Sequence, residues 1–138
     1  MVEIEVDYTG ELHCAARHVP SGSTLGTDAP LDNQGRGEDY SPTDLCATSL
    51  VTCMMTIMGI RARDMGVDIA GARAIVKKIM SADSPRRIVG LPVEVRVPGE
   101  LKDDQKRALR EAAENCPVNC SIHPEIERPI TFIWADGD

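Results

Sequence analysis

One uncharged segment, LCATSLVTCMMTIMGI at residues 45–60, constrains the fold of this chain more than any other. It is preceded by Ser41, a good helix N-cap, by Pro42, which suits the first helical position, and by Asp44, placed like a capping-box acid. These signals predict a helix from Pro42 to about Met65. The sixteen residues of the run fall short of the roughly 18–20 that span a bilayer. We therefore interpret this segment as a buried core helix.

The composition indicates one globular domain over residues 1–138, because 42% of the residues are apolar. The net charge is −7, from 22 acidic and 15 basic residues. The sequence shows neither a basic stripe nor aromatic residues interleaved with arginine, which argues against nucleic acid and membrane surfaces as partners. The N-terminal sequence VEIEVDY lacks the basic start and apolar core of a signal peptide. We therefore expect a cytoplasmic protein.

Hydrophobic periodicity predicts an α+β architecture in which strands and helices follow one another along the chain. Alternating segments near the N-terminus predict a strand meander, and the polar, glycine-rich segment after it predicts a long loop. An apolar stripe after residue 100 predicts a second, amphipathic helix. Apart from the central helix, the predicted elements are strands 2–7, 11–19 and 24–28, a loop 29–41, strands 72–80 and 87–97, a helix 101–115 and a strand 130–134.

Two of the cysteines could form a redox pair. A reducing cytoplasm keeps cysteines as thiols, and this chain has five: Cys14, Cys46, Cys53, Cys116 and Cys120. Cys46 precedes Cys53 by two helical turns, about 10 Å, which is too far for a bond between them. Cys116 ends the stripe of the second predicted helix, so packing of the two helices would bring it to Cys53. Simple core packing explains these thiols equally well, because cysteine is often buried.

Two ligand-binding interpretations are weaker. The spacing Cys116-x3-Cys120-x2-His123 places potential metal ligands together. It matches no usual structural-zinc pattern and has no evident fourth ligand, so we expect no metal ion. A ligand groove in a structural dimer is the other interpretation, although a methionine stripe more often belongs to a core. Its lining would be Met54, Met55 and Met58.

Two motifs together resemble the OsmC/Ohr family. Residues 41–54, S-P-T-D-L-C-A-T-S-L-V-T-C-M, resemble the first-cysteine helix of that family, and residues 112–118, A-x-x-x-C-P-V, resemble its second-cysteine motif. The order of the predicted elements is similar over essentially the whole chain. The resemblance implies an OsmC-like α+β fold with antiparallel sheets packed around a buried central helix. It also implies an intertwined homodimer with its two active sites at the subunit interface.

The same resemblance implies a function in oxidative-stress defence. Such proteins are thiol-dependent, peroxiredoxin-like peroxidases that reduce organic hydroperoxides, so the expected substrate is a small hydrophobic peroxide. Cys53 would be the peroxidatic cysteine and Cys116 the resolving cysteine. No metal, haem, flavin or other cofactor is implied. Electrons would come from an external dithiol, with a lipoyl group as the donor in the best-known branch of the family.

The start of the central helix departs from the family pattern. Family peroxidases often carry N-P-E there, and the glutamate helps to hold an arginine over the thiolate. Thr43 stands at the matching position of this chain. Glu38 in the preceding loop is the candidate replacement, and Arg17 and Arg36 are the candidate arginines, with Arg17 preferred. The alternative function is a redox-sensing or ligand-binding protein of the same fold without efficient turnover.

Overall fold

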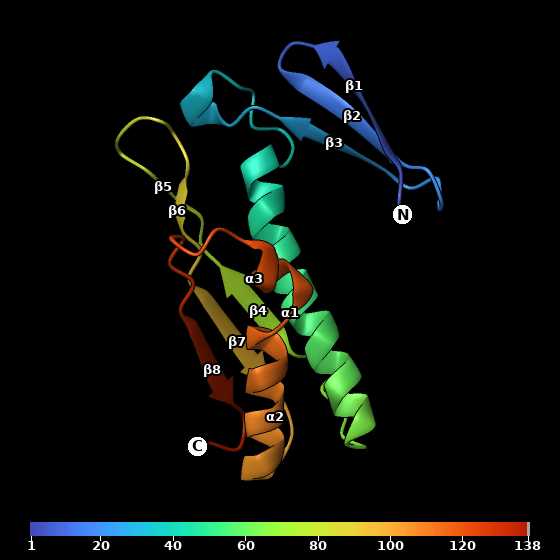
Figure 1. Cartoon of the computed structure of the whole chain (residues 1–138), viewed down its shortest axis with the longest axis vertical. Helices are drawn as coiled ribbons and strands as arrows, with labels where there is room; N and C mark the ends of the chain where they lie inside the picture. Colours follow the sequence, from blue (N-terminus) through green and yellow to red (C-terminus); the bar gives the residue numbers. More distant parts are fainter. Residues whose placement is uncertain (138) are drawn as a thin grey trace. The chain divides into compact units, whose positions relative to one another are not determined.

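The structure is a computed structural model that describes residues 1–137, and it confirms the mixed α+β class (Figure 1). Its contacts group into two compact units, Met1–Cys46 and Ala47–Asp138. The central helix α1 (Pro42–Asp64) begins in the first unit and continues through the second. A single domain over residues 1–138 therefore stays a prediction.

The first unit contains the predicted meander. It consists of β1 (Ile4–Gly10), β2 (His13–His18) and β3 (Thr24–Asp28), paired antiparallel in the order β1-β2-β3. Glu11 and Leu12 join β1 to β2, and both have positive φ angles, of 56° and 60°. Two positive φ angles in succession suit the right-handed twist of a tight hairpin. The two strands predicted at residues 2–7 and 11–19 thus form a hairpin.

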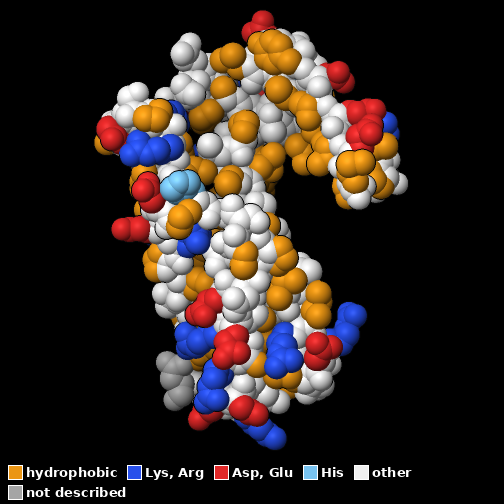
Figure 2. Space-filling view, in the orientation of Figure 1, with side chains coloured by type: hydrophobic (Ala, Val, Ile, Leu, Met, Phe, Trp, Pro, Cys, Tyr) orange, Lys and Arg blue, Asp and Glu red, His pale blue; other side chains and the backbone are white. Residues whose placement is uncertain are grey.

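The first strand alternates as predicted, but its apolar face is uncovered in the single chain. Ile4, Val6 and Tyr8 are 60%, 60% and 65% exposed. Alternation of this kind is typical of a half-buried strand, whereas in the single chain nearly all of β1 is exposed. Figure 2 shows apolar side chains on the surface of this unit. A contiguous apolar face of this kind usually marks an interaction surface.

The loop after β3 is long, as predicted, and one buried carboxylate anchors its end. The loop contains a single 3-10 turn, η1 (Leu31–Asn33). Asp28 is buried at the end of β3, where its Oδ1 lies 2.6 Å from Nδ1 of His13. The backbone N–H groups of Glu38 and Asp39 also donate to the Asp28 carboxylate. These bonds connect the far end of the loop to the meander.

Acidification is expected to loosen this anchor. The hydrogen bond from His13 is the main reason why the pKa of Asp28 lies below its ordinary value. A lowered pKa contributes stability that is complete above the unfolded value of about 3.9 and is lost as the pH falls through the lower folded value. Asp28→Asn should remove this acid-dependent step and speed amide exchange in β3 at pH 7, as measured by hydrogen exchange.

The control for this prediction is Asp7→Asn, because Asp7 is an exposed residue of β1. It should leave both the exchange rate of β3 and its pH profile unchanged. Equal exchange in wild type and Asp28→Asn at pH 7 would show that the carboxylate does not anchor the loop.

The helix α1 begins as the sequence predicts. Asp44 N donates to Ser41 Oγ at 3.0 Å, and Ser41 N donates to Asp44 Oδ2 at 2.9 Å, which is a complete capping box. The helix ends at Asp64, one residue before the predicted end, and Gly66 follows with a φ of 69°. A positive φ is accessible to glycine at little cost, so Gly66 allows the chain to leave the helix.

One face of α1 is buried and the other is not. Thr52 and Thr56 lie on the exposed face, where each hydroxyl donates to the carbonyl one turn earlier. By length and composition alone α1 meets the criteria for a membrane span, which the core helix of a soluble protein also meets. Its five buried residues recur every three or four positions, as in a core helix. They are Ala47, Leu50, Met54, Met58 and Ala62.

The second unit contains a three-stranded sheet, made of β4 (Arg73–Val76), β7 (Val93–Val97) and β8 (Ile130–Trp134) in the order β4-β7-β8. Strand β4 pairs antiparallel to β7, whereas β7 and β8 pair in parallel. The parallel pair departs from the expected antiparallel sheets. It arises because a helical segment connects β7 to β8 and returns the chain to the same end of the sheet.

Each of the two strands predicted before the second helix is divided. Residues 79–80 and 88–90 form a separate two-stranded ladder of β5 (Ile79–Met80) and β6 (Ile88–Gly90). Pro92 separates β6 from β7, and proline has no N–H group with which to continue a ladder. The predictions of single strands over 72–80 and 87–97 are therefore wrong in their bounds.

The core of the second unit lies between the sheet and its helices. Along β7 the valines are buried while Glu94 and Arg96 form an ion pair at 2.9 Å on the other face. The helix α2 (Asp103–Glu114) lies alongside the sheet (Figure 1) and contributes its buried stripe to this core. Arg110 of α2 also covers the Phe132 ring of β8, with its guanidinium carbon 4.8 Å from the ring centroid. The wholly buried core residues include Leu50, Met54, Met58, Leu91, Val95, Leu109, Ala113 and Cys116.

Candidate functional site

The two cysteines of the predicted pair lie on different elements of the second unit. Cys53 is half-buried on α1, and Cys116 is wholly buried just after α2. Pro117 interrupts the predicted second helix, but it does not simply end it. It begins a short helix, α3 (Pro117–Ser121), for which Cys116 is the N-cap. Proline at the first helical position is favourable, since its missing N–H would have no partner there.

The structure brings the two sulfurs together. Val118 N donates to the Cys53 Sγ at 3.5 Å, and Asn119 N donates to the Cys116 Sγ at 3.4 Å. Cys53 is also close enough to Cys116 to raise the pKa of the Cys116 thiol. The first turn of α3 therefore supplies one backbone donor to each member of a thiol pair. The roles of attacking and resolving thiol stay predictions.

The surroundings make the two thiols unequal. Burial is the main reason why the pKa of Cys116 lies above its ordinary value, and the adjacent Cys53 raises it further. The N–H of Asn119 opposes these effects without cancelling them. Cys116 is therefore held as a neutral thiol at pH 7, whereas the more exposed sulfur of the pair is Cys53.

An arginine that sequence reasoning missed lies close to this pair. The Nε of Arg128 donates to Asn119 Oδ1 at 2.7 Å, and its Nη1 donates to the carbonyls of His123 and Ile126 at 3.0 and 2.9 Å. Arg128 lies in an irregular segment between α3 and β8. No periodicity or motif marks this position, so only the tertiary structure connects it with Cys116.

The charged residues predicted for the site belong to the first unit, and both sulfurs belong to the second. Arg17 is paired with Glu5 at 3.0 Å, and Arg36 is paired with Glu11 at 3.5 Å, all with exposed side chains. Glu38 is an exposed residue of the loop, and its backbone N–H donates to a carboxylate of the meander. The assignments of Arg17 and Glu38 to the site stay predictions.

The first turn of α1 uses its polar residues for the helix start. Thr43, at the position where family peroxidases often have glutamate, places its Oγ1 3.1 Å from the Oγ of Ser41. Asp44 completes the capping box with the same serine. Where family peroxidases often have a glutamate carboxylate, this chain therefore has a threonine hydroxyl that contacts the N-cap serine of α1.

Cys120 and His123, which the sequence grouped with Cys116 as potential metal ligands, have hydrogen-bond partners of their own. Cys120 is exposed and its Sγ donates to the carbonyl of Asn115 at 3.6 Å, while Nδ1 of His123 accepts from the N–H of Glu125. Cys14 and Cys46 are half-buried thiols. Neither of these two is part of the pair.

A different group of potential metal ligands occurs within residues 1–137. Atoms of His13, Asp28 and Asp39 all lie within 4.8 Å of one another. A Cβ added at Gly26 would come within 2.9 Å of both His13 and Asp39, so the group requires glycine beneath it. The hydrogen bonds that Asp28 receives from His13 and from the loop backbone account for this arrangement as a structural anchor.

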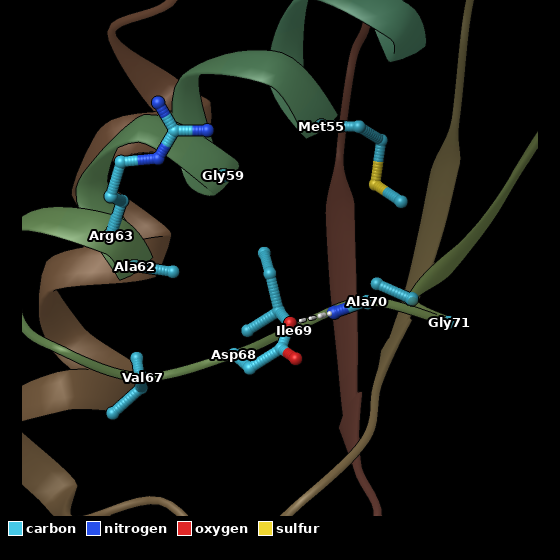
Figure 3. Close-up of a pocket in the computed structure, with 10 residues that line it drawn as sticks. Met55, Gly59, Ala62, Arg63, Val67, Asp68, Ile69, Ala70 and Gly71 are labelled. Atoms are coloured by element: carbon cyan, nitrogen blue, oxygen red, sulfur yellow. Dashed lines mark hydrogen bonds between the residues drawn. The ribbon is translucent and has the colours of Figure 1, made fainter.

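A pocket in this unit does not coincide with the thiols. A pocket of about 450 Å³ lies between the second half of α1 and the segment 67–72, with Met55, Gly59 and Arg63 on its helical side (Figure 3). Neither Cys53 nor Cys116 lines it. Met54 and Met58 are wholly buried in the core, so the three methionines do not line a common groove.

The fold and the site define a class of protein in which a thiol on the central helix meets a Cys-Pro motif that opens a short second helix. The model of the OsmC-like protein family matches residues 35–128, and the chain belongs to that family. No curated protein matches it significantly.

Several solved structures are similar to this chain. A protein from Psychrobacter arcticus 273-4, provisionally described as an osmotic stress induced and detoxification response protein, is 46% identical over 96% of both chains, with a TM-score of 0.91. The organic hydroperoxide resistance protein OsmC of Legionella pneumophila is 13% identical over 96% of both chains, with a TM-score of 0.77. OhrB of Bacillus subtilis is 14% identical, with 96% and 98% coverage and a TM-score of 0.70. The last two show a shared fold.

Proposed function

We propose that the protein is a thiol-dependent peroxidase that reduces organic hydroperoxides in oxidative-stress defence. The observation that carries this proposal is that Cys53 and Cys116, two thiols from distant parts of the chain, both accept hydrogen bonds from the first turn of α3. Peroxide reduction by a two-cysteine mechanism needs one accessible sulfur and a second sulfur within bonding reach. The names of the Legionella and Bacillus relatives suggest the class of peroxide.

In the first step Cys53 attacks the peroxide. Its sulfur, as thiolate, bonds to the outer oxygen of ROOH while the O–O bond breaks, and the alkoxide leaves as ROH after taking a proton. The sulfur loses two electrons and becomes a sulfenic acid. Cys53 suits this role because it is the less buried thiol, and because the N–H of Val118 can stabilise negative charge on its sulfur.

In the second step Cys116 resolves the sulfenic acid. Its sulfur bonds to that of Cys53, the S–O bond breaks, and the hydroxyl group leaves as water with the Cys116 proton. The raised pKa of Cys116 keeps this thiol protonated until the oxidised sulfur is present, which suits the resolving role. An external dithiol then returns both cysteines to thiols by exchange, and itself becomes a disulfide. This step uses no metal or bound cofactor.

A stoichiometric oxidation tests this function. One equivalent of cumene hydroperoxide added to reduced protein should remove two thiols per chain, and peptide mapping should find a disulfide between Cys53 and Cys116. Added dithiothreitol should then support continuous peroxide consumption. A single round of oxidation without turnover would favour a redox sensor, and no loss of thiols would refute both functions.

We also propose a homodimer, supported by the uncovered apolar face of β1. Ile4, Val6 and Tyr8 on that face are all at least 60% exposed in one chain, and contiguous exposed apolar faces often mark protein–protein contacts. Light scattering at micromolar concentration should therefore give the mass of a dimer. Val6→Lys would place a charge in the buried interface and should shift the protein to monomer.

The matched control for the dimer is Asp7→Lys. Alternation along β1 places this residue on the opposite face of the strand from Val6. It introduces the same lysine and should leave the dimer intact. A wild-type monomer at this concentration, or equal behaviour of both variants, would remove this face as the interface.

A further inference from the structure

We propose that Arg128 is a positioning residue for the thiol pair, acting through Asn119 to hold the backbone N–H groups of α3 against the two sulfurs. This inference rests on the proposed peroxidase, because it concerns the reactivity of the same cysteines. It assigns a role to an arginine that lies outside both cysteine motifs.

The short helix α3 needs an external support. It has five residues, Pro117–Ser121, and none of them is buried. Isolated helical turns are unstable in water, because nucleation costs more conformational entropy than one turn of hydrogen bonds returns. Yet Val118 and Asn119 of this helix carry the donors that contact the sulfurs. Packing of Val118 against the core and contacts from outside the helix therefore have to fix its position.

Arg128 provides such a contact from the segment between α3 and β8. Its guanidinium donates to the side chain and the backbone carbonyl of Asn119, at 2.7 and 3.5 Å. It also donates to the carbonyls of His123 and Ile126, which lie on the segment that follows α3. A planar guanidinium with several donors in fixed directions suits such a clamp better than a lysine does.

Asn119 transmits this restraint to the thiols. Its Nδ2 donates to the carbonyl of Glu114 at the end of α2, at 2.7 Å, while its backbone N–H donates to the Cys116 sulfur. Asn119 thus connects Arg128, the end of α2 and the thiol pair. When its Oδ1 loses Arg128, we expect α3 to move and both N–H to sulfur bonds to lengthen.

The bonding partners of Arg128 determine how its charge acts on the thiol pair. Its four hydrogen bonds go to one amide oxygen and three carbonyls, and no carboxylate within residues 1–137 is paired with it. Its guanidinium therefore has no carboxylate within ion-pair distance in the described residues, and it lies one hydrogen-bonded residue away from Cys116. Hydrogen-bond donors and a nearby cation both favour a thiolate over a thiol.

Other titratable groups near the pair do not replace Arg128. On α3 the thiol of Cys120 is exposed and bonded to a carbonyl. On the following segment His123 is exposed and its Nδ1 accepts from a backbone N–H. On α1 and at the end of α2 the groups that face each other are the two thiols themselves.

The test is the pH dependence of Cys53 alkylation by iodoacetamide, followed by mass spectrometry on the reduced full-length protein. In Arg128→Gln the midpoint of the rate profile should move upward by about one pH unit, which corresponds to an approximately tenfold slower reaction at pH 7. Arg128→Lys should recover part of the shift, because it restores the charge without the planar clamp. Arg107→Gln, on an exposed position of α2, should match wild type.

Asn119→Ala gives a second route to the same answer, should Arg128→Gln fail to fold. It removes the bond to Nε of Arg128 and should move the alkylation profile in the same direction. Superimposable profiles in wild type and a folded Arg128 or Asn119 variant would overturn the inference. Alkylation needs no peroxide, so this result is independent of whether cumene hydroperoxide oxidises the protein, which tests the proposed function.

Discussion

Cys53→Ser is expected to abolish the reaction with organic hydroperoxide, whereas Cys116→Ser is expected to lose one thiol per chain and then stop. Serine has no sulfur to oxidise, so the first variant should react on the order of a thousandfold more slowly than wild type. The second variant keeps the attacking sulfur but lacks the thiol that forms the disulfide. Its sulfenic acid should accumulate and be trapped by dimedone, with the adduct on Cys53 identified by mass spectrometry.

The asymmetry between these variants is the informative result. Burial and the raised pKa of Cys116 are the physical reasons for assigning it the resolving role. Cys120→Ser is the matched control, because it removes an exposed thiol from the same short helix. This control should lose two thiols like wild type. Retention of two-thiol loss in Cys53→Ser, or a dimedone adduct on Cys116 instead, would reverse or refute the assignment.

Leu109→Ala is expected to destabilise the protein by about 2–5 kcal/mol, a large part of the roughly 5–15 kcal/mol that holds a typical domain folded. Leu109 is wholly buried on α2 and belongs to the core that this helix shares with the sheet. Truncation removes three carbon atoms and leaves a cavity that close-packed neighbours fill only in part. Urea unfolding should show a lower midpoint with an unchanged slope.

Glu111→Ala provides the control on the same helix. Glu111 is exposed two residues further along α2, and removal of a surface side chain normally changes the free energy of unfolding by no more than about 0.5 kcal/mol. The comparison separates the effect of burial from the effect of an added alanine. Similar stability of both variants would mean that Leu109 is not the core residue that its burial indicates.

Local signals predicted the start of α1 and the existence of most elements. The capping box of Ser41 and Asp44 forms as predicted because its bonds join residues three apart. The apolar stripe of residues 101–115 became α2, although the helix begins at Asp103. Local signals failed at α3, where a proline that stops one helix also starts another.

Burial was harder to predict than secondary structure. The alternation in β1 correctly indicated a strand, but the sequence carries no information on what covers each face within one chain. The uncharged run at residues 45–60 predicted a buried core helix, and in the structure one face of that helix is buried while its threonine face is exposed. Burial depends on the partner surface, and the periodicity of one segment does not specify that partner.

In the candidate site, too, the sequence predicted local features, and the tertiary structure decided the contacts between them. The sequence by itself determined that one cysteine lies on an apolar helix and that another ends an apolar helical stripe. Such stripes can be predicted because they consist of apolar residues three and four positions apart. Only the tertiary structure decided that Cys53 and Cys116 lie close together and that Arg128 is connected to them by its hydrogen bond to Asn119. These contacts join segments far apart in the chain. Their formation depends on how whole elements pack, which no local pattern records.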